Sequence, residues 1–464
     1  RDVAPSRGLG DVYKRQLLLI TSILKGFYMN IRFYNAAILT MEQGMKLQHG
    51  EIWVFDNLIG YVGEPSKEPE NSHTHNLKNT IKWDIELNLA GNLIMPGFKD
   101  AHTHSAMTFL RSYADDLPLD KWLNEKVFPM EAKLNDDYIY TFSKIALMEY
   151  LTSGITSNFD MYISPEPVIQ ASIDCGFRTV MTGGLNNFTQ SVEEIDKCYK
   201  KFNGVNDLIS YELGFHAEYT CSRDILEGMA ALALRHHAPV FCHNSETEKE
   251  VNDCIRRYGM TPTVFLDSLG IFRYGGGSYH CVHMTEDDIA VCVKNGLSIV
   301  TNPASNMKLA SGIAPISKFI DNNINLAIGT DGPASNNCLD MFREMFLTTA
   351  LAKLKEKDAS AADADEVLKM ATLGGAKAMG LHNCDTLSRG KKADLIVIDL
   401  NRPNMQPVNN ITKNIVYSGS KENVILTMVN GKILYQNGEF NIGEDPQKIY
   451  ADANQSLKEI KNAG

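Results

Sequence analysis

The pattern of apolar and polar residues divides the chain into two kinds of region, which predict different arrangements of strands and helices. Between residues 93 and 332, short apolar runs alternate with longer stretches in which apolar residues recur every three or four positions. The first pattern is typical of buried strands and the second of amphipathic helices. The runs cover residues 93–104, 154–162, 178–185, 210–219, 238–246, 277–284, 297–303 and 325–332, and the clearest helices are expected at 136–153 and 224–237. Eight alternating units predict a (β/α)8 barrel with its chemistry at the carboxyl ends of the strands.

Outside this region, glycine and asparagine separate the apolar runs. Strands are expected at 31–41, 50–56, 58–64 and 83–98, and again at 389–400, 413–419 and 423–440, with hairpin turns in "VNGK" and "QNG". The simplest account joins residues 29–95 and 385–440 into one small β-sandwich. The barrel then spans 96–384, and a C-terminal helix lies within 441–464.

The first 28 residues are expected to be a leader or an artefact. "KRQLLLITSIL" places two positive charges before a short apolar run, as a signal peptide does, but Lys25 follows closely and no small-residue cleavage site is present. "SRGLGDVYKRQ" also resembles translated adaptor sequence. Met29 is then the expected natural start.

Composition narrows the class of protein. A net charge of −11 repels phosphate backbones, so nucleic acid is not an expected partner. No apolar run reaches the roughly 18 residues that span a bilayer, so no membrane partner is expected. The nine cysteines include no C-x-x-C pair, which indicates reduced thiols in a cytoplasmic protein.

Two His-x-His pairs are candidates for metal binding. His73 and His75 lie in a polar, proline-containing loop, where nothing rigid orients their rings, so we interpret them as solvated. His102 and His104 instead follow the apolar run "NLIMPGF", at the expected end of the first barrel strand.

Other metal-binding residue types fall at the ends of later barrel strands. They are His216 on the fourth strand, His243 on the fifth with Glu246 three residues beyond, His280 on the sixth and Asp331 on the eighth. Neutral imidazoles with one anionic oxygen and an open position for water suit a Zn²⁺-type ion. A single histidine at a strand end is commonly structural, but so many on one barrel rim indicate a metal site.

These residues stand in motifs that resemble a known family. "PGFKDAHTH", "HNSETE", "HCVH", "NPASNMKLASGIAPI" and "GTDGPASNNCLDM" are similar to the amidohydrolase superfamily, and most of all to its methylthioadenosine/S-adenosylhomocysteine deaminases. The resemblance covers about residues 29 to 440. It implies a metal-bearing barrel with a composite β-sandwich, and a metal-dependent hydrolase that removes ammonia from an adenosine-type nucleoside.

The resemblance also implies a role for each residue. One divalent ion, Zn²⁺ with Fe²⁺ or Mn²⁺ as alternatives, would be held by His102, His104, His243 and Asp331. Glu246 would shuttle protons, while His280 and His216 would contact the attacking water or the substrate. No lysine stands at the end of the fourth strand, where dinuclear relatives bridge two metals, so a mononuclear site is expected.

The chemistry of deamination needs these groups in its own right. Asp331 can accept a proton from the attacking water, and Glu246 can protonate the ring nitrogen and then the departing amine, which is general acid–base catalysis. His280 can stabilise the new hydroxyl. The structural alternative for Glu246 is a residue at the start of a helix, and both descriptions can hold together.

Substrate-binding residues are expected after the first strand, in "LDKWLNEKVFPMEAKL". The resemblance implies that Trp122 lines the pocket and that Glu131 binds the ribose hydroxyls. The alternative is that Trp122 packs a loop and Glu131 begins a solvated helix.

Two departures from the family bear on the substrate. Glu218 replaces a usual proline and would add negative charge if it faced the pocket, and "TGGLNNFTQ" contains no basic residue.

These observations leave three hypotheses. A deaminase of adenosine, methylthioadenosine or 5′-deoxyadenosine is favoured, because no arginine is found for the carboxylate of S-adenosylhomocysteine. A guanine deaminase or a triazine-type amino- or chlorohydrolase is the nearest rival. A metal-bearing protein without catalysis is the third, and the presence of all four ligands and Glu246 argues against it. Barrels of this kind commonly self-associate, so a homo-oligomer is also expected.

Overall fold

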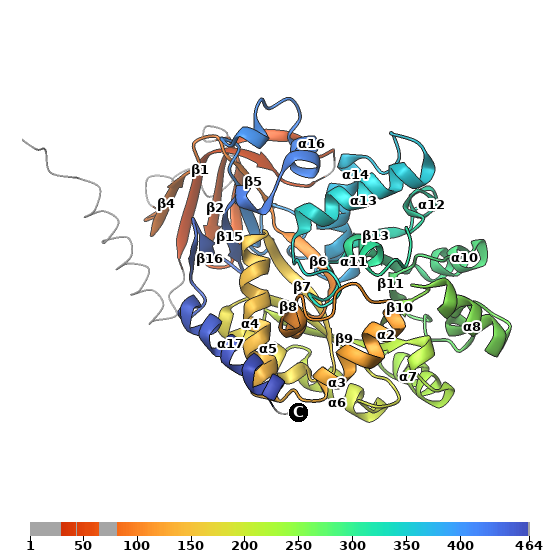
Figure 1. Ribbon diagram of the computed structural model, residues 1–464. Helices are drawn as coiled ribbons and strands as arrows, with labels where there is room; N and C mark the ends of the chain where they lie inside the picture. Colours follow the sequence, from red (N-terminus) through yellow and green to blue (C-terminus); the bar gives the residue numbers. More distant parts are fainter. Residues whose placement is uncertain (1–28, 43, 65–80, 463–464) are drawn as a thin grey trace, which may run out of the picture.

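Eight parallel strands form a nearly closed barrel at the centre of the computed structural model (Figure 1). The structure describes residues 29–42, 44–64 and 81–462, so the expected leader and the pair His73 and His75 lie outside the described residues. Each strand pairs with its sequence neighbour, as repeated βαβ units require. The strands are β6 (Phe98–Thr103), β7 (Ile155–Tyr162), β8 (Arg178–Gly183), β9 (Ile209–Ala217), β10 (Val240–Asn244), β11 (Gly276–His280), β12 (Ser298–Thr301) and β13 (Asn325–Ile328). Just beyond β13, the Asp331 N–H donates to the His102 carbonyl at 2.9 Å, which joins the last strand to the first.

Helices cover the outside of the barrel, and several of them begin at a side-chain cap. Asn135, Ser191, Ser222, Thr247 and Thr285 each accept a hydrogen bond from a backbone N–H in the first turn. The helices are α4 (Asp136–Thr152), α5 (Pro165–Cys175), α6 (Val192–Phe202), α7 (Arg223–His236), α8 (Glu248–Tyr258), α9 (Pro262–Ser268), α10 (Glu286–Asn295), α11 (Pro303–Lys308), α12 (Ile316–Asp321), α13 (Met341–Glu356), α14 (Ala364–Lys369) and α15 (Gly375–Ala378). The predicted barrel and the predicted helices at α4 and α7 are therefore confirmed.

Short helical turns lie in the connections after β6 and β9 and in the chain that follows α14. After β6 they are η1 (Ser105–Leu110), α2 (Leu119–Lys121), η2 (Trp122–Val127) and α3 (Phe128–Glu131), and after β9 there is η3 (Glu218–Thr220). Later in the chain are η4 (Met370–Gly374), η5 (Pro403–Met405), α16 (Ile411–Lys413), η6 (Asn414–Ser418) and η7 (Lys421–Asn423). The turns after β6 bring the predicted substrate segment over the rim of the barrel.

The two ends of the described chain build a second, mixed sheet beside the barrel (Figure 1). Its strands are β1 (Asn30–Leu39), β2 (Leu47–Phe55), β3 (Leu58–Gly63), β4 (Ile85–Asn88), β5 (Leu93–Pro96), β14 (Leu395–Ile398), β15 (Val424–Val429), β16 (Lys432–Gln436) and β17 (Glu439–Phe440). β5 joins the halves, because it pairs in parallel with β1 and antiparallel with β14. Apolar side chains of β1, β2, β14 and β15 share one core, as the predicted composite sandwich requires.

The apolar run predicted as a single strand over 93–104 is divided between the two sheets. β5 belongs to the mixed sheet and β6 to the barrel, and Gly97 stands between them. A Cβ atom at Gly97 would lie 2.1 Å from Thr156 Cγ2, so glycine permits this close approach. Nearby, Arg178 and Asp394 form a buried ion pair at 2.5 Å, which ties the start of β8 to the segment before β14.

The predicted strand over 413–419 is wrong, because residues 413–418 are helical in α16 and η6. Asn410 caps this turn by accepting the Lys413 N–H at 2.8 Å. Ile411 and Ile415, four residues apart, are both buried, which is a helical spacing that a window limited to "KNIVYSG" does not include. The predicted turns at Asn430–Gly431 and Asn437–Gly438 do join antiparallel strands, and all four residues have positive φ.

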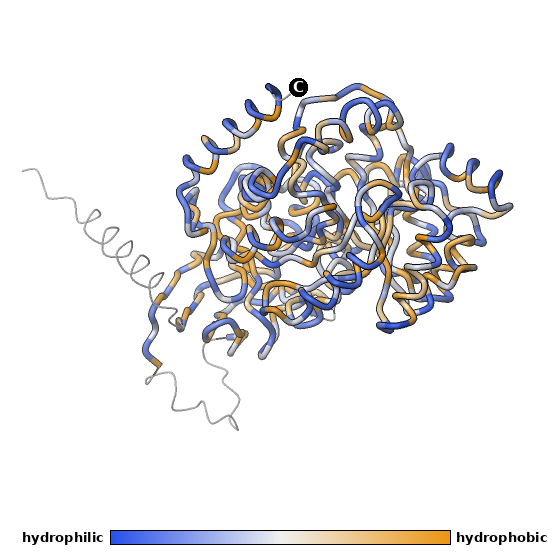
Figure 2. Tube along the Cα trace, turned by 90° about the horizontal axis from the view of Figure 1, so that it is seen from below, coloured by the Kyte–Doolittle hydropathy of each residue, from blue (hydrophilic) through white to orange (hydrophobic). Residues whose placement is uncertain are grey.

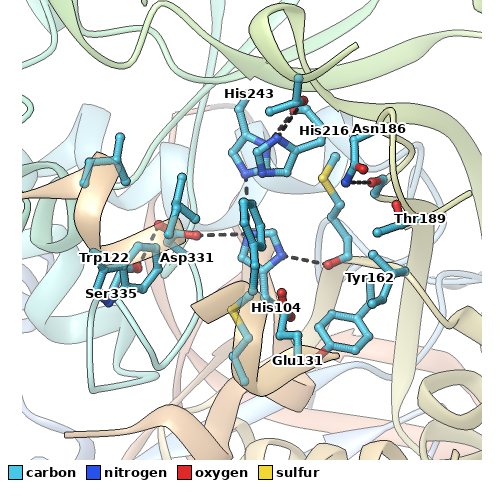
Figure 3. Close-up of a pocket in the computed structure, with 18 of the residues that line it drawn as sticks. His104, Trp122, Glu131, Tyr162, Asn186, Thr189, His216, His243, Asp331 and Ser335 are labelled. Carbon is cyan, nitrogen blue, oxygen red and sulfur yellow. Dashed lines mark hydrogen bonds and ion pairs between the residues drawn. The ribbon is translucent and has the colours of Figure 1, made fainter. Parts of the chain in front are cut away.

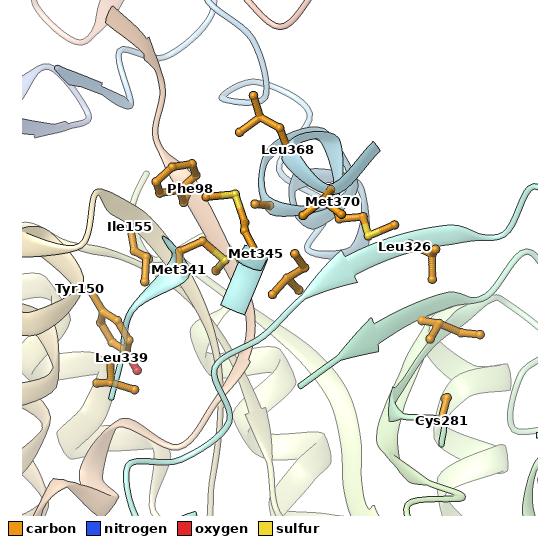
Figure 4. Close-up of a cluster of buried hydrophobic side chains, with 14 of the residues drawn as sticks. Phe98, Tyr150, Ile155, Cys281, Leu326, Leu339, Met341, Met345, Leu368 and Met370 are labelled. Carbon is orange, nitrogen blue, oxygen red and sulfur yellow. The ribbon is translucent and has the colours of Figure 1, made fainter. Parts of the chain in front are cut away.

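Hydrophobic packing joins the barrel to its covering helices. Figure 4 shows Phe98 of β6 and Leu326 of β13 beside Met341 and Met345 of α13 and Met370, all of which are buried. In Figure 2 the C-terminal helix α17 (Pro446–Asn462) is mainly hydrophilic, with hydrophobic residues on one side. No helix in the described residues combines the length and apolar character that crossing a membrane requires.

Candidate active site

A cavity of about 400 Å³ opens at the carboxyl ends of the barrel strands. Figure 3 shows that its walls carry side chains from several strands and from the turns after β6. It is lined by His104, Met107, Leu119, Trp122, Leu123, Phe128, Glu131, Ala132, Met161, Tyr162, Ile163, Gly184, Asn186, Phe188, Thr189, His216, Tyr219, Thr220, His243, Glu246, His280, Leu309, Asp331 and Ser335. Eight of the nine predicted site residues line this cavity, and the ninth, His102, lies buried beneath it.

Four predicted metal ligands converge at the floor of the cavity. One ligand atom from each of His102, His104, His243 and Asp331 lies within 4.8 Å of all the others. His243 Nε2 is 3.1 Å from His102 Nε2 and 3.4 Å from His104 Nε2. Asp331 Oδ1 is 3.2 Å from His104 Nε2 and 3.6 Å from His102 Nε2. Three nitrogens and one oxygen therefore face a common centre.

The hydrogen bonds around the rings prepare the Nε2 atoms as ligands. His104 Nδ1 donates to the Met161 carbonyl and His243 Nδ1 donates to the His216 carbonyl, both at 2.7 Å. With the proton on Nδ1, a neutral ring presents its Nε2 lone pair to the centre. Burial acts to lower the pKa of His104, but Asp331 raises it to about 9, so a bound metal would have to displace the Nε2 proton of this ring. Burial lowers the pKa of His102 to about 3 and holds that of His243 well below its usual range, so both rings are neutral. Converging lone pairs beside one carboxylate fit a divalent cation.

Two serines position the carboxylate of Asp331. Ser305 and Ser335 donate to Oδ2 at 2.6 and 2.9 Å, which leaves Oδ1 directed at the histidines. Burial acts to raise the pKa of Asp331, but the neighbouring imidazoles hold it well below its usual range. Asp331 is therefore a carboxylate and can act as an anionic ligand. Neither serine was singled out from the sequence, although both stand in motifs that were.

Glu246 is held in the cavity wall by contacts from two directions. Ser311 donates to Glu246 Oε1 at 3.0 Å, and the side chain is buried except towards the cavity. The backbone N–H groups of Ser245 and Glu246 both donate to the carboxylate of Glu250, each at 2.8 Å. Ser245 has φ of +52°, a left-handed conformation that non-glycine residues rarely adopt, so Glu250 supports an unusual turn.

Two further histidines lie beside the four converging ligands. The His280 ring is 5.5 Å from that of His243, and its Nδ1 donates to Asn306 Oδ1 at 2.7 Å, which leaves Nε2 as an acceptor. The His216 ring is 4.8 Å from that of His243 and its Nδ1 lies 3.0 Å from Thr220 Oγ1. Burial lowers the pKa of His216 to about 4, so this ring is also neutral.

Trp122 and Glu131 come from the turns after β6 and face the cavity (Figure 3). Trp122 is buried, while Glu131 is partly accessible through the open cavity. Protein surrounds the carboxyl on its other sides, and this burial raises the pKa of Glu131 to about 7, against the opposing effects of Tyr162 and His104. Glu131 is thus not the solvated helix residue that was the alternative.

Glu218 does not line the cavity. Its buried carboxylate forms an ion pair with Arg257 of α8 at 2.6 Å, so the negative charge considered for the pocket is neutralised elsewhere. Within the described ranges, the lining residues include no lysine or arginine. The outer part of the cavity is largely apolar, with Leu119, Leu123 and Phe188 among its lining residues.

Comparisons with known proteins agree with this arrangement. Residues 93–434 match the sequence model described as "Amidohydrolase family". A 5-methylthioadenosine/S-adenosylhomocysteine deaminase from Caldanaerobacter subterraneus subsp. tengcongensis is 35% identical over 93% of this chain and 99% of its own length. A 5′-deoxyadenosine deaminase from Methanobrevibacter smithii is 38% identical over 82% and 89%.

A similar solved structure is that of an adenosine deaminase from Xanthomonas campestris with bound zinc. It is 30% identical, has a TM-score of 0.85 and covers 94% of this chain and 99% of its own. A guanine deaminase from C. acetobutylicum, 20% identical with a TM-score of 0.75 over 88% of this chain and all of its own, shares the fold. With relatives matched over nearly their full length and ligands at the expected strand ends, this chain belongs to the amidohydrolase family.

Proposed function

We propose that this protein is a metal-dependent deaminase that converts adenosine-type nucleosides with an uncharged 5′ end into inosine-type products and ammonia. One observation carries the proposal: Glu246 faces the same cavity as the converging ligands and Glu131. Glu246 and the converging ligands suit hydrolysis of an aromatic amine, and the Glu131 carboxylate suits the binding of a vicinal diol. The deaminases among the relatives support the same reaction.

His102, His104, His243 and Asp331 would hold one divalent ion, for which Zn²⁺ is our proposal because the Xanthomonas relative binds it. When bound, such an ion lowers the pKa of water from about 15.7 towards roughly 7 and so supplies a nucleophile at neutral pH. The chain's own residues then manage the protons. Asp331 accepts a proton from the attacking water, and His280 Nε2 accepts a hydrogen bond from the new hydroxyl.

Glu246 is the proposed general acid and base. Because Ser311 donates to Oε1, Oε2 is the oxygen left to carry a proton, and within the described residues it has no hydrogen bond of its own. A proton delivered from Oε2 to the ring nitrogen beside the attacked carbon makes that carbon more electrophilic. Glu246 then regains the proton that Asp331 took from the water, and a second transfer to the amine makes ammonia the leaving group. The hydroxyl proton, released as the carbonyl forms, returns Glu246 to its protonated state.

The proposal is tested by ammonia release from Zn²⁺-loaded protein with a panel of substrates. Adenosine, methylthioadenosine and 5′-deoxyadenosine are expected to be deaminated. S-adenosylhomocysteine is expected to be a poorer substrate, because no lysine or arginine lines the described cavity to pair with its carboxylate. Turnover of guanine with none of any nucleoside would contradict the proposal.

Glutamine at Glu131 is expected to raise KM for adenosine by about 10- to 100-fold, because a hydrogen bond to a charged group contributes roughly 1.5–3 kcal/mol. The free base adenine, which has no ribose hydroxyls, should be affected little by the change. The measurement is steady-state kinetics of Glu131→Gln with both substrates. Glu125→Gln, an exposed residue of η2 outside the cavity lining, is the control. An equal effect on nucleoside and base would contradict a ribose contact.

Alanine at Glu250 is expected to lower kcat by roughly 10- to 100-fold, because misplacing the Glu246 turn by a fraction of an ångström is costly. KM and bound metal should change little, and Glu250→Gln, which keeps one acceptor oxygen, should restore part of the rate. Glu248→Ala, an exposed residue of the same helix turn, is the control. A lower Tm with unchanged kcat would mean that Glu250 only stabilises the fold.

A further inference from the structure

Tyr162, the last residue of β7, carries a buried hydroxyl that needs a partner. The residue is 2% exposed and lines the cavity, and its hydroxyl lies near the Glu131 carboxyl but forms no hydrogen bond of normal geometry among the described residues. Buried tyrosine hydroxyls normally find a partner, because an unsatisfied polar group is destabilising. A partner supplied by a bound ligand would remove this cost.

The surroundings of the hydroxyl indicate what kind of ligand supplies that partner. Figure 3 shows the Tyr162 ring beside Glu131, on the side of the cavity opposite Trp122 and Ser335. Burial of Glu131 raises its pKa to about 7, and the nearby Tyr162 hydroxyl opposes this shift, which reflects how close the two groups lie. A carboxylate accepts hydrogen bonds and a phenol donates one. Side by side, they match a vicinal diol, whose oxygens both donate and accept.

We propose that Tyr162 is a specificity-determining residue whose hydroxyl donates a hydrogen bond to one of the ribose hydroxyls that Glu131 binds. This inference rests on the proposed function, since it requires a nucleoside substrate. It adds a second recognition group to the diol. Discrimination for the sugar then depends on a donor and an acceptor together, so a sugar without hydroxyls would lose the contacts to both groups.

Tyr162→Phe removes only the hydroxyl and so tests the inference directly. The KM for adenosine is expected to rise roughly 3- to 10-fold, as for loss of one neutral hydrogen bond. With 2′,3′-dideoxyadenosine, which has no ribose hydroxyls, wild type and variant should have the same kcat/KM. The Tm of the ligand-free protein should stay the same or rise, because an unsatisfied buried hydroxyl has been removed.

A second tyrosine provides a matched control. Tyr211 of β9 is fully buried, packs in the same hydrophobic cluster as Tyr162, and also has a hydroxyl without a regular hydrogen bond in the described chain, but it does not line the cavity. Tyr211→Phe should leave the kinetics of both substrates unchanged. This comparison separates substrate binding from a general effect of removing a buried hydroxyl.

The outcomes distinguish this inference from the function on which it rests. Normal wild-type turnover of adenosine, with the same kinetics in Tyr162→Phe, would overturn the tyrosine assignment and leave the deaminase intact. A fall of several degrees in Tm with an unchanged preference for adenosine over the dideoxy compound would also overturn it, as a structural role. Absence of turnover with every nucleoside would overturn both.

Discussion

Glutamine at position 246 is expected to lower kcat by about 10²- to 10⁴-fold, with KM for adenosine changed only a few-fold. Glutamine keeps the length of the side chain, and its amide oxygen can still accept the Ser311 hydroxyl. It has no proton to transfer, so the ring nitrogen and the departing amine both lose their acid. The effect should therefore fall on the chemical step and leave binding nearly intact.

Steady-state ammonia release at saturating adenosine measures this effect, with bound metal determined on the same samples. Glu248→Gln, two residues further on and exposed, removes an equal charge from the same helix terminus and should act like wild type. A Glu246→Gln variant that retains most of its kcat would contradict the proton-shuttle role. A variant with low kcat and no bound metal would instead mean that Glu246 supports the metal site.

Removing the metal is expected to abolish deamination and to lower Tm. Lewis-acid stabilisation of a transition state contributes several kcal/mol, so the rate should fall by about 10³-fold or more. Stability should fall as well, because a ligand that binds only the folded state stabilises it by mass action. Chelation followed by activity assays and thermal unfolding tests both expectations, and adding back Zn²⁺ should restore both quantities.

His243→Ala tests the site without a chelator. Bound metal, measured by elemental analysis, is expected to fall from about one ion per chain towards none, which also tests the mononuclear prediction. His237→Asn is the control, because His237 is exposed outside the cluster and asparagine tolerates its φ of +51°. Full activity in the metal-depleted protein or in His243→Ala would contradict the assigned ligands.

Much of the barrel and of the converging His–Asp cluster could be predicted because the signals are local. Each barrel strand is a short apolar run, and His102, His104, His243 and Asp331 stand at the ends of such runs. Parallel strands place these ends on one rim whatever the details of packing. The strand predicted over 413–419 failed because a short apolar run does not by itself distinguish a strand from a helix.

The supporting contacts could not be predicted because they depend on side-chain direction. Glu250 was visible in "NSETEKE", four residues after Glu246, but its reach back to two N–H groups requires the left-handed turn at Ser245. Tyr162 ends the run "FDMY", and only the folded turns after β6 bring Glu131 beside it. The sequence likewise does not say which way Glu218 points, and in the structure its carboxylate pairs with Arg257.

The mixed sheet has a consequence for how the chain folds as it is synthesised. β5 pairs with β14, yet the whole barrel lies between them in the sequence, so β5 emerges from the ribosome long before its partner. Until β14 arrives, the edge of β5 is open, and an open edge can pair with a strand of another nascent chain. Chaperones that cover exposed strands should therefore matter most for this protein during the interval between synthesis of residues 93–96 and 395–398.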